Sequence, residues 1–189
     1  MRPLVKENVA LTERSRQVEL GPDQDLRLSE KRAGWVAKMK SFRIGRELEY
    51  LAITLPDRDP EGAEHLASYD YYNSNWVSAR IEIAVGGFEG SYLATLFRSD
   101  FPHFRNDLRK LYSFESSEGR FSTMENQLDI EIKGDRRGNF EAICVARDTS
   151  NGNRLEFKLR FDQTEIPPML AGLDSIIAGY PVLGKKPRP

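Results

Sequence analysis

The chain has 189 residues, and its 28 Lys and Arg against 29 Asp and Glu give a formal net charge of -1. A chain that binds nucleic acid by itself usually carries a clear basic excess, so this balance argues against that class. A disordered chain would combine low hydrophobicity with high net charge, whereas 39% of these residues are hydrophobic. The composition therefore predicts one folded domain with a heavily charged surface.

Localisation and metal content can be predicted from what the sequence lacks. Residues 1–8 contain no apolar signal core, and no stretch of about 18 apolar residues is present to span a membrane. Cys144 is the only cysteine, so no disulfide can form within the chain. We therefore expect a cytoplasmic protein that does not contact a membrane. Because His65 and His103 are the only histidines, we expect no zinc site, no other metal and no cofactor.

The two ends of the chain are the least patterned parts. Residues 1–40 contain a turn signal at residues 21–23 between short apolar alternations, and a weak hairpin, an extension of the main sheet or a loose arm would each fit. Residues 182–189 are basic and are predicted to form a flexible tail. A single domain is therefore expected over residues 41–181.

Alternating apolar and polar residues predict about six strands within this domain. Gly86-Gly87 and Asn151-Gly152 predict tight hairpin turns, and such short links imply antiparallel pairing. The predicted strands cover residues 42–55, 76–85, 91–97, 128–133, 140–147 and 155–162.

Two amphipathic helices are predicted between and after the strands. The first begins at Ser99, whose side chain is expected to cap it, and continues to about residue 113 with one apolar stripe. The second begins at Pro167-Pro168 and ends at Gly179. We therefore expect an α+β fold in which one antiparallel meander sheet carries both helices on one face.

A long acidic loop at residues 57–75 is the strongest candidate for a binding surface. Its tyrosines resemble the composition of interface hot spots, and its acidic charge would steer a basic protein partner. The alternative is that Trp76 belongs to the core and the tyrosines pack along a strand edge. The candidate partner-binding residues are Asp57, Asp59, Glu61, Glu64, Tyr69, Asp70, Tyr71 and Tyr72.

No pattern in the chain predicts a catalytic centre. Asp129 and Glu131 lie two residues apart on a strand and so share a face, which would suit carboxylate hydrolysis, but the surrounding Lys and Arg favour a solvated, ion-paired face. His103 is expected on a helix surface, without a serine or cysteine nucleophile to serve. The glycines at residues 86–90 are followed by a strand, which indicates a turn and not a phosphate loop.

The organisation of residues 41–181 resembles the WapI-type immunity protein family. The resemblance rests on a Leu55-Pro56-Asp57 step, on the segment from Asp70 to Val77 with its Asn75-Trp76 pair, on the spacing of Asp100, Phe104, Leu108 and Leu111, and on the steps Leu155-Glu156-Phe157 and Phe161 to Thr164 before a helix that ends at Tyr180-Pro181. It implies a small bacterial cytoplasmic protein without a catalytic motif, which protects the producing cell by binding a toxin domain and blocking its active site.

We therefore predict a non-catalytic protein that binds a cognate toxin domain. Two alternatives stay open: a hydrolase that uses surface carboxylates, and a nucleic-acid-associated regulator that uses residues 1–40 and the basic tail. The charge balance disfavours the second. No pattern in the chain specifies an oligomeric state.

Overall fold

The computed structural model describes residues 39–56 and 70–186, all within the unit Lys38–Pro189. The expectations for the N-terminal extension, for most of the acidic loop and for the last three residues of the tail lie outside these residues.

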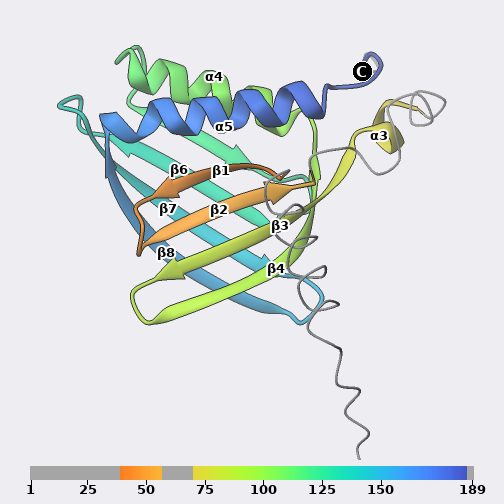
Figure 1. The fold of residues 1–189 in the computed structure, drawn as a ribbon, viewed down its shortest axis with the longest axis horizontal. Helices are drawn as coiled ribbons and strands as arrows, with labels where there is room; N and C mark the ends of the chain where they lie inside the picture. The colour runs from red at the N-terminus through yellow and green to blue at the C-terminus, as the bar shows by residue number, and fades with distance from the viewer. Residues whose placement is uncertain (1–38, 57–69, 187–189) are drawn as a thin grey trace, which may run out of the picture. The chain divides into compact units, whose positions relative to one another are not determined.

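Eight strands form two antiparallel sheets, each a meander of four (Figure 1). The first sheet has the order β1-β2-β3-β4 and the second has the order β5-β6-β7-β8. The strands of the first sheet are β1 (Lys40–Gly45), β2 (Tyr50–Leu55), β3 (Trp76–Val85) and β4 (Phe88–Phe97). Those of the second are β5 (Glu118–Ser122), β6 (Leu128–Gly134), β7 (Asn139–Asp148) and β8 (Asn153–Asp162).

The α+β class and the antiparallel pairing are confirmed, but three details of the sequence prediction were wrong. The stretch 42–55 is two strands, because residues 46–49 turn the chain back. Glu118–Ser122 is a strand that the sequence analysis missed. The strands form two sheets whose apolar faces share one core, in place of one sheet with a helical cover.

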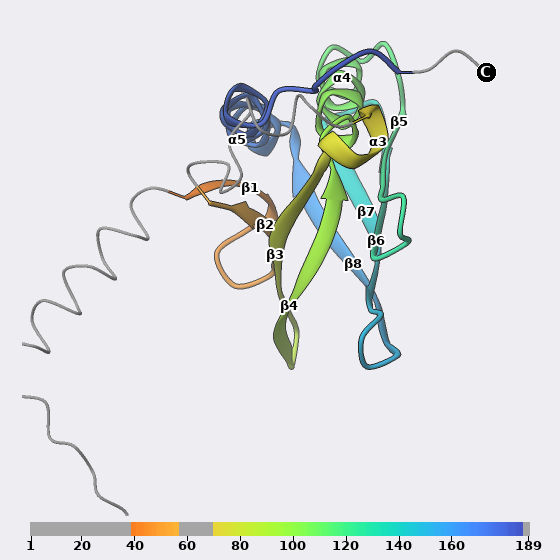
Figure 2. The ribbon, with the colours of Figure 1, turned by 90° about the vertical axis from the view of Figure 1, so that its right-hand side faces the viewer.

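Among the described residues, four helical segments accompany the strands, and two of them belong to the core. They are α3 (Tyr71–Ser74), α4 (Asp100–Tyr112), the short 3-10 turn η1 (Gln163–Glu165) and α5 (Ile166–Gly179). The apolar stripe predicted for the first helix is buried in α4. In α5, Ile166, Met169, Leu173 and Ile176 are buried. Figures 1 and 2 show α4 and α5 side by side, on the same side of both sheets.

The element order repeats, since each half of the domain is four strands followed by a helix. α4 packs against β5, and α5 packs against β1, the first strand of the other half (Figure 2). A glycine permits each approach. A Cβ on Gly172 of α5 would lie 2.5 Å from the Ser41 carbonyl oxygen and 2.8 Å from the Phe42 Cβ, and one on Gly119 of β5 would lie 2.8 Å from Leu111 Cδ1.

The first turn of α4 differs from the prediction. The side chain of Ser99 makes no capping hydrogen bond. The Asp100 carboxylate instead accepts a hydrogen bond from the backbone N–H of Phe97, at 3.3 Å. Because Asp100 is largely buried, desolvation raises its pKa to about 6, and the Phe97 hydrogen bond only partly offsets this.

The close packing of α5 on β1 predicts that Gly172→Ala destabilises the fold. The new methyl group would displace the β1 backbone, so the free energy of unfolding should fall by about 1–3 kcal/mol in urea titrations, although alanine is the better helix former. Ser175→Ala is the matched control, because it also introduces alanine into α5 but at an exposed position. Equal effects of the two substitutions would contradict this packing.

The environment of Asp100 predicts a pH-dependent effect of Asp100→Asn. The folded-state pKa lies above the ordinary value, so ionisation of this group costs stability as the pH rises from about 4 to about 6. Asparagine keeps an acceptor for Phe97 and cannot ionise. The variant should therefore gain stability over the parent between pH 4.5 and pH 7.5, measured by thermal unfolding at both values. A difference that does not change with pH would contradict the assignment.

Candidate functional site

Asp70 begins the described structure after the acidic segment, and it has a local structural role. Its carboxylate accepts hydrogen bonds from the backbone N–H of Asn73, at 2.9 Å, and from Asn73 Nδ2, at 2.8 Å. This is the geometry of an N-cap, and Asp70 is the N-cap of α3. The cap fixes the direction in which the next two tyrosines project.

Four aromatic side chains gather next to α3, and we call them the aromatic patch: Tyr71, Tyr72, Trp76 and Phe97. Phe97 lies at the centre and is buried, with its ring centroid 5.6 Å from that of Tyr71 and 5.0 Å from that of Trp76. Tyr72 packs edge-on against Tyr71 at 5.4 Å and remains 45% exposed. A rigid aromatic base with one exposed tyrosine is suited to contact with another protein.

Asn75 ties this region to the C-terminal end of the domain. Its side chain is fully buried and bonds Leu183, which lies in the segment 181–183 that we call the strap. Nδ2 donates to the Leu183 carbonyl oxygen at 2.9 Å, and Oδ1 accepts from the Leu183 N–H at 2.9 Å. Nδ2 also donates to the Tyr71 carbonyl oxygen at 2.6 Å. One amide therefore satisfies partly buried backbone groups of both α3 and the strap.

Arg98 and Tyr180 extend the same polar cluster. The buried Arg98 donates through Nη1 to the Pro181 carbonyl oxygen at 3.3 Å, and its backbone N–H donates to the Asn75 carbonyl oxygen at 2.9 Å. The Tyr180 hydroxyl donates to the Pro56 carbonyl oxygen at 2.8 Å. Pro56, which follows β2, and Asn75, which precedes β3, are thus held by Tyr180 and Leu183, just beyond the end of α5.

The structure describes only some of the predicted site residues. Asp57, Asp59, Glu61, Glu64 and Tyr69 lie outside the described residues. Asp70, Tyr71 and Tyr72 come together at α3, and the rings of Tyr71 and Tyr72 pack against Phe97 at the end of β4.

The sequence pattern did not identify the buried residues Asn75, Arg98 and Phe97 as organisers of the region. Asn75 had been noted only as part of the Asn-Trp pair. Its partners on the strap lie 108 residues away in the chain, so no local pattern could have identified them.

Of the two carboxylates predicted to share the outer face of the second sheet, Asp129 is paired with a cation and Glu131 is exposed. Asp129 Oδ2 lies 2.8 Å from Arg147 Nη1, and Asp129 Oδ1 accepts from Ser122 Oγ at 2.5 Å. Partial burial alone would raise the pKa of Asp129, but these hydrogen bonds and the charges of Arg147 and Arg120 lower it below its ordinary value. A carboxylate held ionised in this way is a poor general acid.

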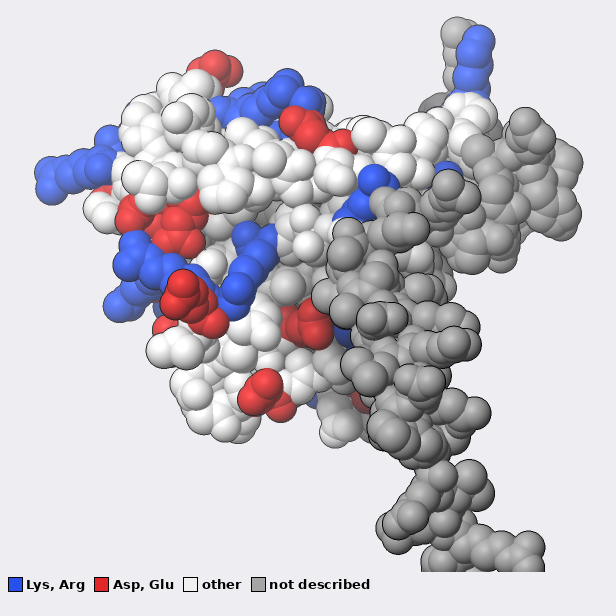
Figure 3. Space-filling model, viewed as in Figure 1, with Lys and Arg blue, Asp and Glu red and all other residues white. Residues whose placement is uncertain are grey.

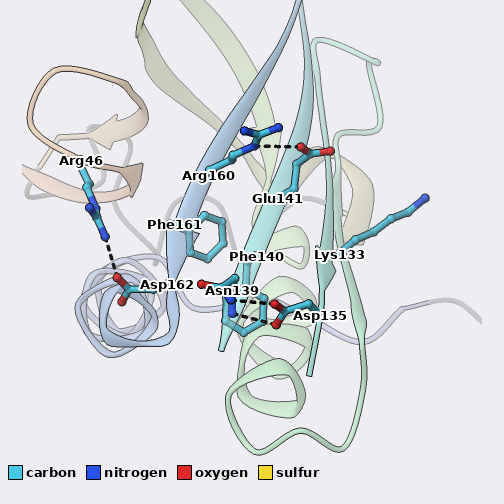
Figure 4. Close-up of a pocket in the computed structure, with 9 residues that line it drawn as sticks. All are labelled: Arg46, Lys133, Asp135, Asn139, Phe140, Glu141, Arg160, Phe161 and Asp162. Atoms are coloured by element: carbon cyan, nitrogen blue, oxygen red, sulfur yellow. Dashed lines mark hydrogen bonds and ion pairs between the residues drawn. The ribbon is translucent and has the colours of Figure 1, made fainter. Parts of the chain in front are cut away.

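A hollow of about 410 Å³ opens beside this face, and Figure 4 shows the residues that line it. Arg46, in the β1–β2 turn, lies at one side of it and forms ion pairs of 2.6 Å with both Asp162 and Glu165. Glu141 is paired with Lys158 at 3.0 Å and with Arg160 at 3.3 Å, which lowers its pKa. The Arg46 pairs join the β1–β2 turn to the end of β8 and to η1, and the Glu141 pairs join β7 to β8, so the charged groups of the hollow have structural partners.

Residues 39–56 and 70–186 contain no group of His, Cys, Asp and Glu that could hold a metal ion. His103 is exposed on α4, and Gly86-Gly87 forms the β3–β4 turn, with φ of 54° at Gly86. Among the helices in these ranges, none has the length and apolar character to cross a membrane.

Residues 42–181 match the family model of the immunity protein WapI-like family. The search of curated proteins found no match. Among solved structures, a chain from the crystal structures of trypanosoma bruciei MRP1/MRP2 is similar, with 12% sequence identity, a TM-score of 0.45 and coverage of 80% of this chain and 92% of that one.

The role of Asn75 predicts that Asn75→Ala weakens the whole cluster. Loss of the amide leaves buried backbone groups of Leu183 and Tyr71 without their partner, so the free energy of unfolding should fall by about 2–3 kcal/mol. Asn73→Ala is the control, since Asn73 is exposed and its side chain bonds only Asp70. Limited proteolysis should also release the C-terminal residues earlier in Asn75→Ala. An unchanged denaturation midpoint would show that the strap is not held by this residue.

Proposed function

Because the chain belongs to the immunity protein WapI-like family, which matches residues 42–181, we propose that it neutralises a bacterial toxin domain by binding it. The protein acts by stoichiometric contact and not by catalysis, in the cytoplasm of the cell that makes the toxin. Membership of the family carries this proposal. The ion pairs of Asp129 and Glu141 on the second sheet support it, since a carboxylate held ionised by neighbouring cations is a poor general acid.

The toxin binds at the aromatic patch and at the acidic segment that precedes it. Tyr72 supplies an exposed aromatic anchor on a rigid base, which is the composition of a binding hot spot. Asp57, Asp59, Glu61 and Glu64 supply negative charge in the adjoining sequence. Lys and Arg are nearly absent there, so the segment attracts a basic toxin surface and speeds its association.

The function is tested with the toxin-like domain encoded beside this gene. The purified chain should form a complex of one copy of each with that domain and should abolish its activity, and co-expression should rescue cells that produce it. A matched domain from an unrelated toxin serves as the specificity control. Absence of both binding and protection would refute the proposal.

The binding surface is tested by Tyr72→Ala, with Tyr112→Ala as the matched control. The two tyrosines are 45% and 43% exposed, and Tyr112 lies at the end of α4, away from the patch. Tyr72→Ala should weaken toxin binding at least tenfold, as removal of a hot-spot aromatic does, measured by calorimetry. Equal effects of the two changes, or none, would place the interface elsewhere while leaving the function itself intact.

A further inference from the structure

The outer edge of β4 offers backbone hydrogen-bonding groups to solvent. The Thr95 N–H points away from β3, because it donates to Gln127 Oε1 at 2.7 Å. Residues two apart on a strand direct their N–H groups to the same side, so those of Leu93, Ser91 and Glu89 point to this edge as well. Within the described part of the chain, no backbone hydrogen bond covers these three residues on that side. Gln127 therefore closes the edge at Thr95, and the edge is open from Leu93 to Glu89.

The edges of the other outer strands are protected, and that of β4 is not. α5 packs against β1, and α4 packs against β5. β8 alternates charges along its length, at Arg154, Glu156, Lys158 and Arg160, which is a common protection against edge pairing. β4 has the same length as β8 but contains one charged residue, Glu89. In Figure 3, Lys, Arg, Asp and Glu side chains cluster over the β1–β2 turn.

Apolar surface accompanies the open edge. Leu93 is 72% exposed and Phe88 is 67% exposed. On the inner side, a hollow of about 250 Å³ lies between the ends of the two hairpins, where Phe88 and Tyr92 face Leu155. A Cβ on Gly90 would meet no atom within 4 Å. A glycine within a strand often marks the close approach of another backbone.

We propose that this edge pairs with the β4 edge of a second copy of the chain, antiparallel and centred on Ser91. In this register each Ser91 faces the other, and Glu89 of one copy faces Leu93 of the second. These are the residues whose backbone groups are open, so each pair exchanges two hydrogen bonds and the first sheets of both copies become one continuous sheet. On the inner side, Tyr92 of one copy faces Gly90 of the other, where the space is empty.

The charges on the outer face are complementary in this register. Arg80 reaches across β4, since its Nη1 donates to Ser91 Oγ at 3.2 Å, and it is the β3 neighbour of Leu93. Glu89 of the second copy lies opposite Leu93, one strand from the Arg80 guanidinium. The two-fold symmetry forms this Arg–Glu pair twice, and no like charges face each other across the axis.

The dimer is reversible, because a short strand pair buries less than the roughly 1,200 Å² of a standard stable interface. Sedimentation velocity of the full-length chain from about 1 μM to about 500 μM should show a concentration-dependent monomer–dimer equilibrium. Ser91→Pro should raise the dimer dissociation constant at least tenfold without unfolding the domain, because the N–H that it removes points away from β3. Lys158→Pro, at the charged β8 edge, should leave the equilibrium unchanged.

The register is tested by exchange of the charges. Glu89→Arg and Arg80→Glu should each weaken the dimer at least tenfold at low salt, and the double variant should restore it. Circular dichroism of each variant establishes that it is folded. A chain that stays monomeric over the whole concentration range would overturn the proposal. The edge would then be available for pairing with a strand of another protein. A dimer that is insensitive to Ser91→Pro and to both charge reversals would also overturn it, because the copies would then meet elsewhere.

Discussion

The contact between α5 and β1 closes the domain, because it joins the last helix to the first strand. Each half of the chain makes a sheet with one apolar face, and neither sheet could cover that face alone. Gly172 lets the helix backbone reach the strand, and the Arg46 ion pairs to Asp162 and Glu165 hold the same junction from the outside. The core, the strap and the aromatic patch all depend on the end of α5 being in this place.

Local patterns predicted the elements but not their assembly. The strands with full alternation and the hairpin turns at Gly86-Gly87 and Asn151-Gly152 were found, because period-two burial and turn chemistry are local properties. β5 was missed because Gly119 interrupts its alternation. That glycine is needed by α4, whose Leu111 leaves no room for a Cβ. One sheet or two sheets produce the same alternation, so the number of sheets could not be inferred from it.

The candidate site was predictable only at its surface. Tyr71 and Tyr72 stood out by composition, and both contribute to the aromatic patch. Asp70 was selected for its charge, but its carboxylate caps α3. Asn75 and Arg98 act through partners near the end of the chain, so their roles depend on long-range packing. Buried polar residues of this kind need the fold before they can be interpreted.

The Asn75 side chain bonds the backbone of α3 on one side and that of the strap on the other, so the two segments are ordered together. A ligand that holds Tyr71 and Tyr72 in place lowers the free energy of the state in which the strap is docked. The coupling is reciprocal. Detachment of the strap lowers the affinity for the ligand by the same factor by which the bound ligand lowers the equilibrium constant for detachment. The rate of amide hydrogen exchange at Leu183 therefore reports whether a ligand is bound at Tyr72.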